Sequence, residues 1–165
     1  MLPKVKPPLR LLAVATILIT AVPAVSAEES DKNVYTLASL QGDYALVGLY
    51  GSNVARLNGV FRADGNGGLS GTAQINAPGS GGQRVLVAVS FAGTYTVTPE
   101  GLGVIAVTIS LPNGATTPAT IDLLLTKLER IRGTSVAVEA TTMQRELSSI
   151  VGGEFITHAI FRRGD

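Results

Sequence analysis

The first residues that could do chemistry are the run D-G-N-G-G, Asp64 to Gly68. Oxygen-bearing side chains between glycines are typical of EF-hand calcium loops, which also need a ligand at position 5, glycine at position 6 and a glutamate at position 12. Counted from Asp64, these positions hold Gly68, Leu69 and Ile75. We therefore interpret the run as a tight turn and predict no metal site there.

A single histidine, His158, is the next candidate. One histidine without cysteine excludes a histidine or thiolate metal cluster, and no G-x-S-x-G nucleophile motif accompanies it. His158 is a candidate general base in a pocket. The alternative, which we prefer, is a partly buried and hydrogen-bonded side chain on one strand face with Ile156 and Ile160. Under either interpretation we expect no cofactor.

Glu139 is the third candidate, within the alternating segment T-S-V-A-V-E-A-T-T-M. Val136, Val138 and Ala140 share one face of this segment, and Glu139 lies on the other. If the apolar face points inward, Glu139 is a solvated surface residue, which is the interpretation we favour. A bulge that reversed this orientation would bury a carboxylate with a raised pKa, capable of acid/base catalysis.

Several glycines are followed two positions later by an aromatic residue, and four of these rings are considered as candidates. Residues i and i+2 of a strand face the same side, so a ring can cover the gap where the glycine lets the strand bend. We predict that the four rings point into a closed sheet, where they are candidates for contact with a ligand. They are Tyr44, Phe61, Tyr95 and Phe155.

The elements that position these side chains are short segments rich in Val, Ile, Thr and aromatic residues, separated by Gly, Pro, Asn and Asp. This chemistry is typical of strands and turns. One short helix is predicted over residues 144–151, closed by two glycines. Eight strands are predicted, at about 42–50, 55–63, 69–77, 84–98, 102–111, 119–129, 134–144 and 154–163.

Connections between these strands are too short for parallel crossovers, so neighbouring strands should pair antiparallel. We predict an all-β fold, an eight-stranded antiparallel up-and-down barrel, because closure removes exposed edges. The alternative is a two-sheet β-sandwich. An outer-membrane barrel is disfavoured, because four tyrosines and four phenylalanines are few for aromatic girdles and the chain ends in F-R-R-G-D.

The first 27 residues have the order of a secretory signal peptide. Basic residues between positions 4 and 10 precede an apolar run over residues 11–22, and a V-S-A site ends at Ala27. The run is short for a membrane span of about 20 residues, and Pro23 follows it. We predict cleavage after Ala27, a flexible leader over residues 28–39, and one β-barrel domain over residues 40–165 of a secreted or periplasmic bacterial protein.

Composition excludes several classes of protein. Cleavage would leave ten basic against 12 acidic residues, a net charge near minus two, so we expect no nucleic-acid partner. The absence of cysteine excludes a lipid-anchored lipoprotein and a disulfide-stapled domain. After signal cleavage we also expect no membrane association.

Two predicted strands are apolar on both faces, which a soluble barrel does not need. Leu86 and Ala88 lie opposite the Val87 face of one strand, and Val104 and Ala106 lie opposite Ile105 in the next. We expect the outer face to be covered by a homo-oligomer interface. The alternative cover is the leader or the segment around Leu147.

Two hairpins carry a family resemblance, F-R-A-D-G-N-G-G-L-S-G at residues 61–71 and G-T-Y-T-V at residues 93–97. They resemble uncharacterised secreted bacterial β-barrel proteins with F-x-x-D-G-x-G-x-L/I-x-G hairpins, from which this chain departs by the inserted Gly68. The architecture is distantly similar to allene oxide cyclase-like barrels, which often trimerise and bind or cyclise apolar molecules in the lumen. This similarity concerns the fold and carries no catalytic residue onto the chain.

Three functions remain open at this level. The first is binding of a small apolar ligand in the lumen. The second is an allene oxide cyclase-like cyclase or isomerase that holds a reactive substrate beside one acid/base group. The third is a structural or surface protein with a solid barrel core. An open lumen would favour the first two, and a buried carboxylate or histidine touching it would favour the enzyme.

Overall fold

The computed structural model describes residues 34–50, 55–145 and 156–164 of the chain. Two short 3-10 helices are η1 (Leu37–Ser39) and η2 (Ser80–Gly82). The strands are β1 (Gln41–Tyr50), β2 (Ala55–Asp64), β3 (Gly68–Pro78), β4 (Arg84–Val97), β5 (Leu102–Ser110), β6 (Thr116–Ile131), β7 (Thr134–Gln144) and β8 (Ile156–Arg162). Within the described residues, no helix is long and apolar enough to cross a membrane.

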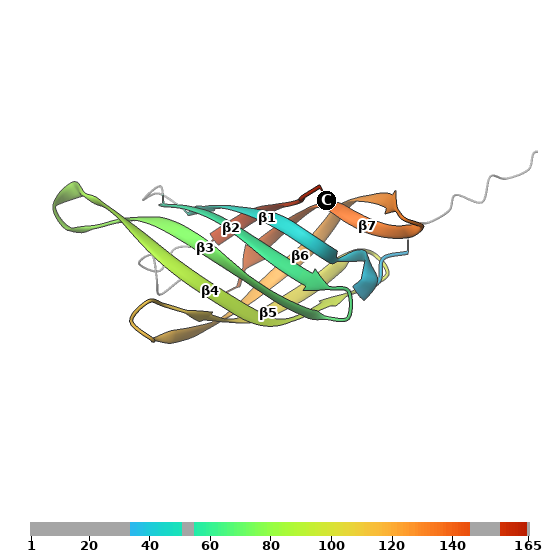
Figure 1. The fold of residues 1–165 in the computed structure, drawn as a ribbon, viewed down its shortest axis with the longest axis horizontal. Helices are drawn as coiled ribbons and strands as arrows, with labels where there is room; N and C mark the ends of the chain where they lie inside the picture. Colours follow the sequence, from blue (N-terminus) through green and yellow to red (C-terminus); the bar gives the residue numbers. More distant parts are fainter. Residues whose placement is uncertain (1–33, 51–54, 146–155, 165) are drawn as a thin grey trace, which may run out of the picture. The chain divides into compact units, whose positions relative to one another are not determined.

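The strands form one closed barrel, in which each strand pairs antiparallel with its neighbour in the chain and β8 pairs with β1 (Figure 1). The predicted up-and-down barrel is confirmed, and the two-sheet sandwich is excluded. Strand boundaries agree with the sequence-based ranges to within three residues. The predicted helix over residues 144–151 lies outside the described residues except for its first two, and Gln144 ends β7.

Alternation along each strand decides which side chains fill the barrel. In β3, Leu69, Ala73 and Ile75 are buried, whereas Ser70 and Thr72 between them are exposed. This period of two is the one expected for a sheet with one face toward the core. The barrel interior is therefore lined by aliphatic and aromatic side chains.

Gly71 of β3 lets two rings enter the interior side by side. It lies opposite Phe61 on one side and Phe91 on the other. A Cβ at position 71 would stand 2.6 Å from both Phe61 Cβ and Phe91 Cζ, so only glycine accommodates both rings. A glycine thus makes room for rings of both neighbouring strands here, although neither Gly71 nor Phe91 belongs to the glycine–aromatic pairs singled out in the sequence.

One end of the lumen is solid. Tyr44, Tyr95, Leu123 and Leu125 are each no more than 2 % exposed, and Leu40, just before β1, is fully buried among them. The inward orientation predicted for Tyr44, Phe61 and Tyr95 is confirmed, whereas Phe155 lies outside the described residues. This end of the barrel is a filled hydrophobic core.

Residues 34–39, the part of the predicted leader that the structure describes, contribute η1 to this solid end. The hydroxyl of Tyr95 donates hydrogen bonds to the carbonyl oxygens of Leu37 at 3.0 Å and Leu40 at 2.7 Å. The backbone N–H of Tyr35 donates to the carbonyl of Pro99. These bonds join the segment before β1 to the barrel.

A register shift between β6 and β7 corrects one detail of the predicted inward face. Pairing slips around Lys127, so that Val136 and Ala137 are both buried, where strict alternation placed only Val136 inside. Beyond the shift, Ala140, Thr142 and Gln144 point inward in regular alternation. The irregularity therefore decides which β7 side chains reach the lumen.

Candidate functional site

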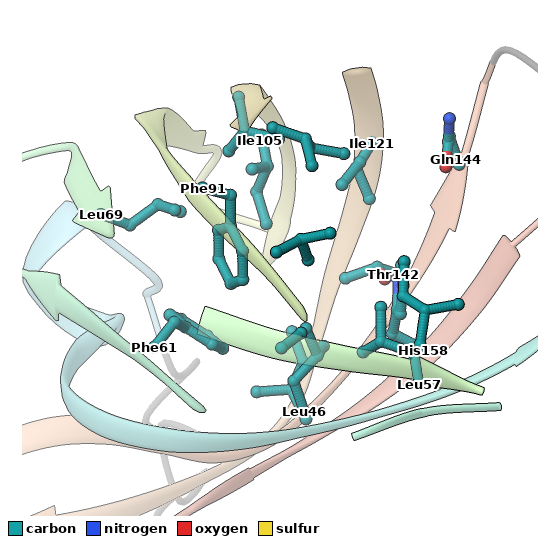
Figure 2. A pocket seen from close by; sticks show the side chains of 16 residues that line it. Leu46, Leu57, Phe61, Leu69, Phe91, Ile105, Ile121, Thr142, Gln144 and His158 are labelled. Carbon is teal, nitrogen blue, oxygen red and sulfur yellow. Dashed lines mark hydrogen bonds between the residues drawn. The ribbon is translucent and has the colours of Figure 1, made fainter. Parts of the chain in front are cut away.

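The other part of the lumen contains a cavity of about 70 Å³ (Figure 2). All eight strands contribute to its wall, with thirteen apolar and three polar side chains. None of the lining residues is acidic, and none is lysine or arginine. The apolar lining residues are Leu46, Leu57, Phe61, Leu69, Ala73, Ile75, Val89, Phe91, Ile105, Val107, Ile109, Ile121 and Ile160.

Two stacked rings separate the cavity from the solid end. The ring centroids of Tyr44 and Phe61 are 5.1 Å apart, with 14° between the ring planes. Phe61 faces the cavity, while the hydroxyl of Tyr44 donates to the carbonyls of Gln41 at 3.2 Å and Ala137 at 3.1 Å. Burial raises the pKa of Tyr44, which keeps the phenol neutral.

Of the three predicted ligand-contacting rings that the structure describes, only Phe61 reaches the cavity. Phe61 lines it, Tyr44 and Tyr95 belong to the solid end, and Phe155 lies outside the described residues. Phe91 is a lining ring that sequence reasoning did not single out. The alternation along β4 could have predicted this position, since Phe91 shares the inward face of the strand with Val87 and Val89.

The three polar lining residues lie together on β7 and β8. Thr142 pairs directly with His158 across the β7–β8 ladder, and Thr142 Oγ1 lies 2.8 Å from His158 Nδ1. Gln144 follows Thr142 by two positions and therefore faces the same side. Figure 2 shows these three side chains on one side of the cavity, away from Phe61 and Leu69.

His158 is an uncharged group in this wall. Its side chain is 8 % exposed, and burial lowers its pKa from 6.5 to about 4. A neutral imidazole carries one N–H donor and one acceptor nitrogen, and the hydrogen bond with Thr142 orients the ring. The structure thus combines both interpretations of His158, because the side chain is buried and hydrogen-bonded and also lines a pocket.

Of the three polar lining residues, Gln144 has the fewest side-chain hydrogen bonds. Its side chain is only 6 % exposed, yet its carboxamide makes no hydrogen bond within the described part of the chain. A buried polar group without a partner costs about 1–3 kcal/mol. Sequence reasoning missed Thr142 and Gln144, because T-T-M-Q has no recognisable functional spacing.

Glu139 lies on the outside of the barrel, as the favoured interpretation has it. Its side chain is 49 % exposed, and Glu139 Oε1 lies 3.8 Å from Lys127 Nζ. Lys127 also contacts Glu129 at 3.0 Å. Glu139 is therefore part of a solvated charge cluster and does not reach the cavity.

The D-G-N-G-G run is a turn between β2 and β3. Asp64 Oδ1 accepts hydrogen bonds from the backbone N–H of Asn66 at 2.7 Å and of Gly68 at 2.9 Å, which lower the pKa of Asp64. Its carboxylate thus binds the backbone of its own loop. Within the described ranges, no three His, Cys, Asp or Glu side chains are grouped to hold a metal ion.

Fold and site together define a small antiparallel β-barrel with one solid end and one apolar cavity, into which a buried histidine and glutamine project. Comparisons with protein-family models, with curated proteins and with solved structures found no match.

Proposed function

We propose that this protein binds a small apolar molecule in the lumen of its barrel. The observation that carries the proposal is the cavity wall, in which thirteen apolar side chains come from seven of the eight strands. Covering such a surface with an apolar ligand contributes roughly 25 cal/mol per Å² removed from water. A concave, mostly apolar pocket with a few convergent polar groups is the usual form of a small-molecule site.

The size of the cavity bounds the ligand. A volume of 70 Å³ equals that of about two water molecules in the liquid, at roughly 30 Å³ each. The ligand is therefore small, or only its apolar part enters the lumen. Secretion or a periplasmic location belongs to the same proposal and rests on the predicted signal peptide over residues 1–27.

A filling variant with a matched control tests this proposal. Ala73 of β3 lines the cavity, whereas Ala106 of β5 is exposed on the outer face. In a titration with n-hexane followed by methyl NMR, the wild type and Ala106→Leu should show saturable shifts of lumenal leucine and isoleucine methyls. Ala73→Leu should lose at least tenfold in affinity. No saturable shifts in the wild type would contradict lumenal binding.

An isomerase or cyclase is the second candidate, and one observation favours it: a buried histidine touches the cavity. His158 would act as its single acid/base group. A pKa of about 4 makes it a weak base near neutral pH, and none of the other lining side chains titrates. Binding without chemistry is therefore better supported.

Proton exchange separates the two candidates. The α-protons of 2-hexanone exchange with D₂O when a base abstracts them, so an enzyme of this kind should accelerate exchange in the wild type. His158→Gln should abolish the acceleration. An unchanged exchange rate with saturable 2-hexanone binding supports the binding protein.

The third candidate, a structural protein with a solid core, accounts for only part of the interior. The Tyr44–Phe61 stack and its neighbours fill one end, but the cavity occupies the other part. We therefore place this function behind the other two.

We also propose that the protein forms a homo-oligomer through its outer face. A row of paired outward residues crosses five strands from β1 to β5 by way of β8, β7 and β6, with only one polar member. Exposed apolar patches of this kind favour interfaces. The row consists of Val47, Ala159, Thr141, Leu124 and Leu102.

Light scattering tests the interface. Leu124→Lys, within this row, should shift the protein to monomer, whereas Thr72→Lys, on the outer face of β3 and away from the row, should not. A wild type that is already monomeric at all concentrations would contradict this proposal.

A further inference from the structure

We propose that the lumenal ligand carries one uncharged hydrogen-bonding group, a hydroxyl or a carbonyl, which His158 and Gln144 bind. This inference rests on the proposed lumenal binding and specifies its ligand class. The ligand is then an apolar molecule with one polar end, oriented so that this end lies against β7 and β8.

The first support is the hydrogen-bonding capacity that these side chains leave unused. Thr142 occupies Nδ1 of His158, and Nε2 of the same ring makes no hydrogen bond within the described residues. The carboxamide of Gln144 has neither its donors nor its acceptor used there. Both side chains are more than nine-tenths buried and line the cavity. Buried polar groups are paired in most proteins, so a bound polar group is the simplest partner.

The second support is the position of these groups within an otherwise apolar wall. Gln144 and Thr142 lie on one face of β7, and His158 lies opposite Thr142 on β8. The remaining lining residues are aliphatic or phenylalanine. Hydrogen-bonding groups on one side and apolar groups everywhere else fit a ligand with a single polar end (Figure 2).

The third support is the lack of fixed charge in the cavity wall. No acidic residue, lysine or arginine lines it, and the histidine is buried as a neutral ring. A carboxylate or ammonium group in the lumen would therefore lose its water without gaining a counter-ion. The wall discriminates against charged ligands of the same size.

Both hydrogen-bonding directions are available to a neutral group. The hydroxyl of Thr142 can donate to Nδ1, which places the proton of the ring on Nε2, or accept from it, which leaves Nε2 as an acceptor. Gln144 offers a donor and an acceptor as well. The pair thus accommodates a ligand carbonyl or a ligand hydroxyl.

Four six-carbon probes test this inference: n-hexane, 1-hexanol, hexanoate and hexylammonium at pH 7.5. We expect 1-hexanol to bind the wild type at least tenfold more tightly than hexanoate or hexylammonium. Gln144→Leu should weaken 1-hexanol binding about tenfold and leave n-hexane binding unchanged or stronger. Ile121→Val is the control, because Ile121 pairs with Gln144 across the β6–β7 ladder and lines the same cavity. The Ile121→Val variant should change the affinities for n-hexane and 1-hexanol by the same factor.

Direct observation of the histidine complements the variants. The ¹⁵N resonances of the His158 ring should shift on addition of 1-hexanol and much less on addition of n-hexane. If n-hexane binds but Gln144→Leu leaves 1-hexanol binding unchanged, the lumenal site stands and the polar recognition is wrong. Tighter binding of hexanoate than of 1-hexanol would also overturn it. If no probe binds, the proposed function itself fails.

Discussion

Gly48 of β1 lies directly opposite His158 of β8, and a Cβ at position 48 would stand 2.7 Å from Cδ2 of the imidazole. The same atom would also come within 3.1 Å of Leu57 Cβ. The missing side chain of Gly48 is therefore the space that the histidine ring occupies. This relationship makes the position of His158 sensitive to a single methyl group.

We predict that Gly48→Ala displaces the ring of His158 and loosens its hydrogen bond with Thr142. Overpacking of this kind costs about 1–3 kcal/mol of the free energy of unfolding. Urea denaturation measures the cost, and the ¹⁵N shifts of the imidazole report the displacement. Gly164→Ala is the control, because a Cβ there would meet nothing within 4 Å. Unchanged imidazole shifts in Gly48→Ala would show that the ring is not held by this space.

Stability should depend on pH through His158. Burial lowers its pKa from 6.5 to about 4, so the unfolded chain takes up a proton at higher pH than the folded barrel. The contribution of His158 to the free energy of unfolding is therefore complete above pH 6.5, and falls by roughly 3 kcal/mol between pH 6.5 and 4. Below pH 4 it changes no further.

Urea denaturation of the wild type and His158→Gln between pH 7.5 and 4 measures this dependence. The variant should lack the loss assigned to the histidine. The lowered pKa values of Asp64 and Asp122 place their losses at lower pH, and both carboxylates remain in the variant. Parallel pH profiles for the two proteins would contradict a neutral buried histidine.

We predict that Tyr95→Phe loosens the segment before β1. The variant keeps the ring in the solid end but loses both hydrogen bonds to the carbonyls of Leu37 and Leu40. The expected cost is about 1 kcal/mol. Hydrogen exchange should accelerate at the amides of Ser39 and Leu40, which close η1.

Tyr35→Phe provides the matched control for this experiment. The hydroxyl of Tyr35 makes no hydrogen bond within the part of the chain that the structure describes, and its backbone bond to Pro99 is unaffected by the change. Exchange at Ser39 and Leu40 should stay slow in this variant. Equal acceleration in both variants would show that the effect does not depend on the two hydrogen bonds of the Tyr95 hydroxyl.

Calcium should not stabilise the loop after β2. Asp64 Oδ1 is already bonded to the N–H groups of Asn66 and Gly68, so Asp64→Ala should lower the melting temperature by removing turn bonds. Adding millimolar calcium should leave the melting temperature of the wild type unchanged. A calcium-dependent increase that Asp64→Ala abolishes would restore the ion-binding interpretation.

Much of the barrel architecture can be predicted from local sequence patterns. The alternation of Leu69, Ala73 and Ile75 with polar residues depends only on the period of two along a strand, and short turns such as D-G-N-G-G leave antiparallel pairing as the only connection. The inward rings followed from the same alternation. These features are visible in the sequence because each depends on residues a few positions apart.

The candidate site can be predicted only in part, because its residues are brought together by contacts between positions far apart in the sequence. His158 stood out by its residue type, but its partner Thr142 is 16 positions away and becomes its neighbour only through the β7–β8 register. Gln144 belongs to the inward-facing set of β7 residues beyond the register shift at Lys127. No spacing of residues in the sequence predicts that shift.

Strand order, closure and the orientation of most side chains thus follow from near-neighbour chemistry that the chain carries along its length. The division of the lumen into a solid end and a cavity does not, because it depends on how side chains from eight strands fill one common volume. Tyr44 and Phe61 illustrate this difference. Both carry the same glycine-aromatic motif, yet only packing in three dimensions places Tyr44 in the solid end and Phe61 at the cavity wall.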